Sequence, residues 1–345
     1  MKAVLADRHH ADLWWSLSLL FEKRLGWKLW CPYGMNWYDK GYFRFYGDLR
    51  KEDPYRFIAK QYLEDTIFKR PNGEMVLRET YEGCLDYPKP NLLTFEEFKE
   101  TPIDIILCSV HENEEYFAKL KEFQPKAKFI RQVGNELDSL VNHELYPNLL
   151  SSATKPFNEF QGKNKVLYRQ EFDLNLFKYE PPRFFRNLWS FQNDLGQFPE
   201  AWEWWLRLKH NLPDFYFQSF GVTNEQGKIY SKRDFVKKML EASFHFIVKD
   251  WDGYGHAIHN AIALGRPVIT KGEYYKGRLA DPLLEDGETC LFIDNDVSPV
   301  EERIKYWSKP ENLRKMCEKA YRRFCEVVDF DEEFKQIKEF LENLK

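Results

Sequence analysis

Short apolar runs alternate with amphipathic stretches along most of the chain. Residues 2–6 read Lys-Ala-Val-Leu-Ala and predict a short buried strand. Apolar residues recur at helical spacing between Leu13 and Phe21, so residues 11–25 are expected to form a helix. A second short strand begins at Lys28. Strand, loop, helix and strand in this order indicate the start of an α/β unit with a parallel sheet.

The same alternation returns after residue 100 and continues to the end of the chain. The further expected strands are 103–109, 128–133, 148–152, 187–192, 214–220, 244–248, 267–270 and 290–293. The further expected helices are 114–123, 199–209, 232–242, 256–264, 299–307, 310–327 and 331–344. We therefore expect two α/β blocks of similar size, each with a parallel sheet.

Two segments between these elements lack a clear period. Residues 32–90 are interpreted as an insertion. The polar segment 153–165 contains Pro and Gly and is interpreted as the crossing between domains. The expected domains are accordingly an N-terminal domain at 1–165 and a C-terminal domain at 166–330.

Composition narrows the class of protein. The chain has 345 residues, of which 43% are hydrophobic and 31% charged, as in globular proteins. Its net charge is -4, and basic and acidic residues balance within the first 170 residues, which argues against nonspecific nucleic-acid binding. We expect a cytoplasmic protein because no secretory signal or transmembrane segment is evident. The six cysteines show no zinc spacing, so no metal site is expected.

The most informative stretch follows the expected strand 244–248. Gly253 and Gly255 allow the backbone to approach a ligand closely. The helix that starts near His256 offers N–H groups and a positive dipole end to a diphosphate. Asp252 lies in the loop. Asn260 follows His256 by four residues, so Asn260 can face the ligand at the helix start.

This stretch resembles the C-terminal signature of GT-B glycosyltransferases, in particular the retaining group 1 family that includes relatives of glycogen synthase and sucrose synthase. Residues 252–255 read Asp-Gly-Tyr-Gly, residues 260–263 read Asn-Ala-Ile-Ala, and Gly265 precedes Pro-Val. Residues 168–177 and 284–293 resemble two further stretches of the family in the right order. Together these matches cover most of 166–293.

The resemblance implies a GT-B fold, in which two Rossmann-like domains face a central cleft and the final helix, 331–345, returns to the first domain. It implies an enzyme of the hexosyltransferase type that moves a sugar from a nucleoside diphosphate sugar to an acceptor hydroxyl with retention. A UDP-sugar such as UDP-glucose is the favoured donor. No cofactor or metal is required beyond this donor, and the acceptor partner is unknown.

The resemblance also assigns residues of the donor site. The two glutamates of the family appear here as Asp252, expected to contact the donor sugar as a catalytic residue, and Asn260, expected to hold the ribose hydroxyls. Helix capping by Asp252 and a structural role for Asn260 are the alternatives. The family's Arg and Lys after the first strand of this domain are missing at 190–196. The other expected donor-site residues are Tyr230, Gly253, Tyr254, Gly255, His256, Lys271, Lys276 and Arg278.

Residues of the N-terminal domain are candidates for the facing side of the cleft. Asp7, His9 and His10 follow the first strand, at the carboxyl edge where α/β sheets bind ligands. The histidines are expected to contact donor or acceptor, and Asp7 would serve as a base if the reaction inverts. Arg131 and Asn135 end another strand and are candidates for acceptor binding. A structural role is the alternative for the histidines, and a surface loop is the alternative for Arg131 and Asn135.

Aromatic residues make up 17% of the chain, and several gather without a period at 33–46. Trp37 and Tyr42 are therefore candidates for stacking on the acceptor, which can be a sugar, a small metabolite or an unstacked base. A DNA glycosyltransferase acting on a hydroxymethylated base is one alternative function. A nucleotide-sugar epimerase is another, and the missing glutamates leave a non-catalytic sugar-nucleotide binder as a third.

Overall fold

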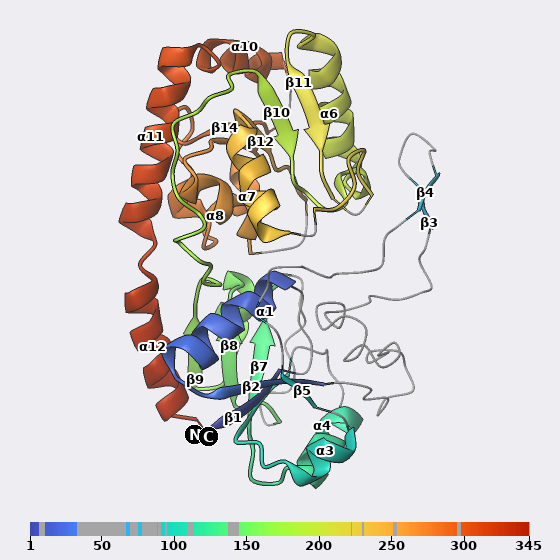
Figure 1. Ribbon diagram of the computed structural model, residues 1–345, viewed down its shortest axis with the longest axis vertical. Helices are drawn as coiled ribbons and strands as arrows, with labels where there is room; N and C mark the ends of the chain where they lie inside the picture. Colours follow the sequence, from blue (N-terminus) through green and yellow to red (C-terminus); the bar gives the residue numbers. More distant parts are fainter. Residues whose placement is uncertain are drawn as a thin grey trace. The chain divides into compact units, whose positions relative to one another are not determined.

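The chain folds into two compact units, which we call unit 1 and unit 2. Unit 1 comprises Met1–Glu64, Thr80–Phe172 and Phe330–Lys345, and unit 2 comprises Asp65–Glu79 and Asp173–Asp329. The computed structural model (Figure 1) describes residues 1–6, 11–32, 67–69, 75–77, 88, 91–93, 95–108, 114–136, 145–221, 223–229, 231–250, 254–294 and 298–344.

Unit 1 is built on a parallel sheet of seven strands in the order β5-β2-β1-β6-β7-β8-β9. These strands are β1 Ala3–Ala6, β2 Lys28–Pro32, β5 Asn91–Leu93, β6 Ile105–Cys108, β7 Lys128–Val133, β8 Asn148–Ser151 and β9 Asn164–Leu167. The central strands β1 and β6 read as continuous apolar runs because both faces of the sheet are covered.

Helices cover both faces of this sheet. They are α1 Ala11–Ser18, the π-helical segment η1 Leu19–Arg24, α3 Phe95–Glu100, α4 Glu114–Phe123, α5 Thr154–Glu159 and α12 Phe330–Glu342. On one face, α1 and α12 lie side by side (Figure 1). They share a core in which Trp14 and Ile337 pack with Val4 of β1. On the other face, Phe98 of α3 and Leu120 of α4 pack against alternate residues of the same strands.

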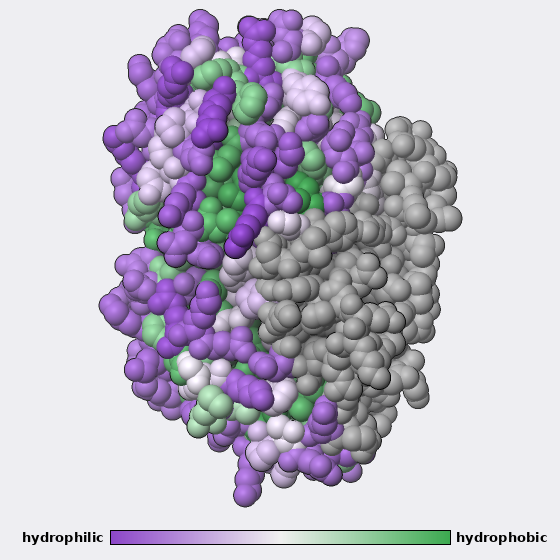
Figure 2. Space-filling view, viewed as in Figure 1, coloured by the Kyte–Doolittle hydropathy of each residue, from purple (hydrophilic) through white to green (hydrophobic). Residues whose placement is uncertain are grey.

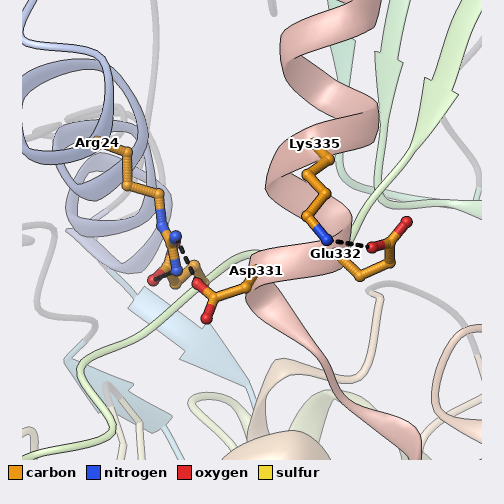
Figure 3. A network of polar contacts seen from close by, with 5 residues as sticks. Arg24, Asp331, Glu332 and Lys335 are labelled. Carbon is orange, nitrogen blue, oxygen red and sulfur yellow. Dashed lines mark hydrogen bonds and ion pairs between the residues drawn. The ribbon is translucent and has the colours of Figure 1, made fainter.

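Ion pairs hold α12 against the rest of unit 1. The Nε and Nη2 atoms of Arg24 each lie 2.8 Å from a carboxylate oxygen of Glu171. The remaining nitrogen, Nη1, lies 2.7 Å from Asp331 at the start of α12, as Figure 3 shows. Arg169 pairs with Glu333 of the same helix, and its backbone N–H donates to Glu333 at 2.8 Å.

Unit 2 contains a parallel sheet of five strands in the order β11-β10-β12-β13-β14. These are β10 Asn187–Ser190, β11 Tyr216–Ser219, β12 Phe244–Phe246, β13 Val268–Thr270 and β14 Cys290–Phe292, and the antiparallel pair β3 Ile67–Lys69 and β4 Met75–Leu77 forms a separate sheet. The helices are η2 Leu195–Gln197, α6 Pro199–Asn211, α7 Lys232–Glu241, α8 His256–Ala263, α9 Gly272–Tyr275, η3 Asp281–Leu283, α10 Ser298–Trp307 and α11 Pro310–Val327.

Two elements differ from the sequence expectation. The expected helix 11–25 is α-helical only to Ser18 and continues as a π-helix, in which Leu25 N–H donates to the carbonyl of Leu20. The segment 153–165, interpreted as a crossing between domains, instead forms α5 and the start of β9 within unit 1. Its polarity was misleading because β9 is an edge strand in which only Val166 is buried.

Hydrophilic side chains cover much of the described surface in the view of Figure 2. None of the helices within the described residues combines the length and the apolar character that a membrane span needs.

Candidate functional site

The order of strands in unit 2 defines where a ligand is expected. The chain leaves β10 for β11 on one side and later returns to β12 on the other side of β10. Ligands of open α/β sheets bind at such a switch point, beyond the carboxyl ends of the two strands. Here these ends lead into Phe191 and Gln192 after β10, and into Ile247 and Val248 after β12.

The start of α8, the helix that follows β12, lies close to a neighbouring turn, and Gly255 makes this contact possible. Gly255 precedes the helix with φ 90°, in the left-handed region that favours glycine. A Cβ atom there would lie 3.0 Å from Cβ of Ala280 and 3.4 Å from Cε1 of Tyr275. The turn 276–280 therefore lies against the start of α8. Because Gly255 has no side chain, the first helical turn lacks a side-chain cap and suits an anionic ligand group.

Aromatic and amide side chains surround this helix start. The ring of Tyr254 stacks on His259 with centroids 4.7 Å apart. Nδ1 of His259 lies 2.9 Å from the carbonyl of Gly255, so this nitrogen carries the proton and donates it. Asn260 is 1% exposed, and none of the described residues donates a hydrogen bond to its Oδ1. A buried carbonyl oxygen of this kind is suited to accept a hydrogen bond from a ligand hydroxyl.

The three cations expected near the diphosphate have different surroundings. Lys271 pairs with Asp250 and Glu200. Burial alone would lower the pKa of Lys271, but hydrogen bonds to these carboxylates outweigh it and raise the pKa above its ordinary value. Lys276 is exposed and lies 3.6 Å from Glu273.

Arg278 differs from both lysines. Its guanidinium stacks on the ring of Tyr274, 3.8 Å from the centroid. Within the described part of the chain, its buried Nη1 has no hydrogen-bond partner and no carboxylate pairs with Arg278. Arg278 also lies in the turn that contacts Gly255 through Ala280. It is therefore the best placed of the three to balance a diphosphate at the start of α8.

The loops after β10 and β11 are joined by hydrogen bonds at the same edge of the sheet. The amide of Asn224 donates to the carbonyls of Gln192 and Phe220 at 2.5 and 2.9 Å. A Cβ atom at Gly221 would lie 2.4 Å from the carbonyl oxygen of Asn193, so this close approach requires glycine. Gln192 is 3% exposed, and neither polar atom of its side chain has a partner in the described structure. Gln192 was not predictable from the sequence, because a glutamine carries no recognisable signal there.

Several predicted site residues lie outside the described residues. In unit 2 these are Tyr230, Asp252 and Gly253, and in unit 1 they are Asp7, His9, His10, Trp37 and Tyr42. Their expected roles stay predictions. The structure does describe Arg131, which is buried within β7, and Asn135, which lies partly buried just after it. His256 is also described and is the first residue of α8.

Metal ligation has no candidate in the described part of the chain, because no group of three or more His, Cys, Asp or Glu side chains there is placed to hold an ion.

Comparison with solved structures identifies the architecture. HepE from Anabaena, solved with UDP and with UDP-glucose, superimposes with a TM-score of 0.61 at 11 to 12% identity, and all of both chains is covered. Sucrose-phosphate synthase from Thermosynechococcus elongatus has a TM-score of 0.58 at 10% identity, covering 99% of this chain and 98% of that one. TarM has a TM-score of 0.52 at 12% identity, and the match covers 68% of this chain and 54% of TarM.

These solved structures are GT-B glycosyltransferases, so the expected GT-B fold and the resemblance at the level of fold are confirmed. No family model matches the chain, and no curated protein matches its sequence.

Proposed function

We propose that the chain is a glycosyltransferase that moves a hexosyl group from a UDP-sugar to an acceptor hydroxyl with retention. The observation that carries this proposal is the start of α8, where Gly255 in the left-handed region brings the turn of Arg278 against an uncapped helix end. This site lies beyond the carboxyl edge of the unit 2 sheet, in a chain with the fold of UDP-binding HepE.

The proposed reaction breaks the bond between the sugar C1 and the UDP oxygen, and UDP leaves with the electron pair. The acceptor oxygen forms the new bond to C1, and its proton passes to the departing phosphate. Negative charge grows on the diphosphate as the bond breaks, so Arg278 and the helix dipole stabilise this step more than the ground state. No protein nucleophile is required when the acceptor attacks from the side of the leaving group.

The remaining donor contacts follow from side-chain chemistry and from the resemblance. The buried Oδ1 of Asn260 accepts a hydrogen bond from a ribose hydroxyl, a role that needs an acceptor atom and no charge. Asp252 contacts the donor sugar, as the glutamate at its position does in the family it resembles.

Calorimetric titration with UDP and with uridine tests the donor site. The Arg278→Met variant should bind UDP about 10 to 150 times more weakly than the wild type, because one charged contact to phosphate contributes roughly 1.5–3 kcal/mol. Its affinity for uridine, which lacks phosphates, should not change. Arg183→Met is the matched control, since Arg183 is 77% exposed and its partner among the described residues is nearby Glu180. Failure of the wild type to bind UDP would refute the proposal.

Turnover separates a transferase from the other sugar-nucleotide proteins. UDP release from UDP-glucose should rise when an acceptor is added, and Asp252→Ala should abolish it. Release of an epimer without acceptor would identify an epimerase, and UDP binding without any release would identify a binding protein. Measuring the anomeric configuration of the product by NMR tests retention.

A further inference from the structure

The sheet of unit 1 has its own switch point, at a place distinct from the donor site of unit 2. From β1 the chain proceeds to β2 on one side, and β6 later pairs with the other side of β1. A ligand is therefore expected beyond the carboxyl ends of β1 and β6. Cys108 is the last residue of β6, and its register partner on β7 is Arg131.

The guanidinium of Arg131 is held at this edge but is only partly satisfied. Its Nη1 donates to the carbonyl of Cys108 at 3.0 Å and to that of Gln132 at 3.3 Å. Among the described residues, its buried Nε and Nη2 have no hydrogen-bond partner, and no carboxylate forms an ion pair with Arg131. The residue is 1% exposed, so an uncompensated charge there is unfavourable.

A second buried arginine shows how this chain satisfies a purely structural guanidinium. Arg266 of unit 2 is also 1% exposed. Its Nη1 donates to the carbonyl of Glu180 at 2.8 Å, and its Nε and Nη2 both donate to the carbonyl of Leu240. All three of its nitrogens thus have backbone partners. Arg131 lacks this arrangement, which favours a ligand as its missing partner.

The two unsatisfied atoms of Arg131 define the shape of that ligand. The Nε–H and one Nη2–H of a guanidinium point in parallel and match two oxygens of a carboxylate or phosphate. Arg24 of the same unit uses this pair of atoms to bind the carboxylate of Glu171, with both distances 2.8 Å. An oxyanion with two adjacent oxygens therefore fits Arg131.

We propose that Arg131 binds an oxyanion, either a phosphate or a carboxylate, and that this group belongs to the acceptor. The assignment to the acceptor rests on the proposed glycosyltransferase function, whereas the anion site stands without it. The acceptor class is then an anionic hydroxyl compound, such as a sugar phosphate or a uronic acid.

Titration of the full chain with inorganic phosphate and with acetate tests the anion site. The titrations are made in saturating UDP, so that the donor site is filled, and are repeated with the Arg278→Met variant to remove any phosphate binding there. Arg131→Met should weaken phosphate or acetate binding at least tenfold. Arg131→Lys keeps the charge but loses the paired N–H groups, so it should weaken binding less. Arg183→Met should bind as the wild type does.

Wild-type affinity in both Arg131 variants would overturn the proposed anion site, and the lysine variant decides the question if the methionine variant does not fold.

Acceptor assays then test the assignment of the anion to the acceptor. Glucose 6-phosphate or glucuronate should give at least a tenfold higher kcat/KM than glucose, and which of the two is better distinguishes phosphate from carboxylate. A preference for glucose over both would overturn the acceptor assignment. Absence of UDP binding would refute the donor proposal alone.

Discussion

His245 lies inside unit 2 as a neutral imidazole. The residue is fully buried in the middle of β12, its ring stacks on Phe191 with centroids 5.0 Å apart, and its Nε2 lies 3.0 Å from the carbonyl of Met239. Burial lowers the pKa of His245 to about 3, and the hydrogen bond to Met239 opposes this only in part, while the nearby charge of Arg266 lowers it further. The folded protein therefore resists protonation at this position.

The sign of the resulting pH dependence follows from linkage. In the unfolded chain a histidine takes up a proton near pH 6.5, so the unfolded state gains protons as the pH falls and the folded state does not. The free energy of unfolding should therefore decrease below pH 6.5 and continue to decrease toward pH 3. Between pH 7 and pH 5 this one group contributes a loss of about 2 kcal/mol.

The His245→Phe variant checks this expectation because it keeps the ring against Phe191 and removes the titration. Its free energy of unfolding, measured in urea, should fall about 2 kcal/mol less than that of the wild type between pH 7 and pH 5. Equal losses in both proteins would show that another group causes the pH dependence.

Gly255 is constrained by its left-handed backbone and by its close contact with Ala280. Comparing alanine substitutions at two glycines separates these effects. An L-residue in the left-handed region costs about 1–2 kcal/mol, and a Cβ atom at Gly255 would also press on Ala280. Gly227 has φ 68° with nothing within 4 Å of the corresponding position. We expect Gly255→Ala to destabilise the protein by roughly 1 kcal/mol more than Gly227→Ala in urea unfolding. Equal effects would contradict the close contact between α8 and the turn of Arg278.

At the scale of elements, α12 depends on a partly buried ion pair more than on its exposed ones. The side chains of Arg169 and Glu333 are each 13% exposed, whereas those of Lys335 and Glu332 are 73% and 53% exposed. Removing one member of a partly buried pair leaves the other charge uncompensated. Exposed pairs contribute little because water screens them. Figure 3 shows the exposed pair beside the pair of Arg24 with Asp331.

Two neutralising substitutions on this helix therefore differ in effect. Glu333→Gln should lower the free energy of unfolding of unit 1 by about 2 kcal/mol, because it also weakens the hydrogen bond from the Arg169 backbone. Glu332→Gln should change it by less than about 0.5 kcal/mol. Hydrogen exchange of the α12 amides resolves the effect locally. Similar protection in both variants would show that the apolar face alone holds α12.

Elements with a strong hydrophobic pattern were predictable, and those that depend on tertiary contacts were not. The strand β6 and the helix α8 lie within one or two residues of their expected bounds, since each is buried and sharply patterned. The π-helix and the edge strand β9 carry no such signal, because their geometry depends on what packs beside them.

At the scale of the whole molecule, the resemblance of three stretches within 166–293 to a GT-B family was sufficient to predict a GT-B fold, which the solved structures confirm. The site was less predictable. Gly255 followed from its motif, but the contrast between Lys271, held by two carboxylates, and Arg278 depends on partners distant in sequence. The unsatisfied nitrogens of Arg131 are likewise a property of packing, which no local pattern encodes.

The placement of α12 has a consequence for synthesis of the chain. Unit 1 includes Met1–Glu64 but also needs Phe330–Lys345, which follow Asp173–Asp329 of unit 2 in the sequence. All of Asp173–Asp329 in unit 2 is complete earlier. During synthesis, unit 2 should therefore fold before unit 1. This reverses the usual order, in which the domain that comes first in the sequence folds first. A chain ending at Asp329 should keep a protease-resistant unit 2 while unit 1 is digested, whereas equal resistance of both would show that unit 1 matures without its final helix.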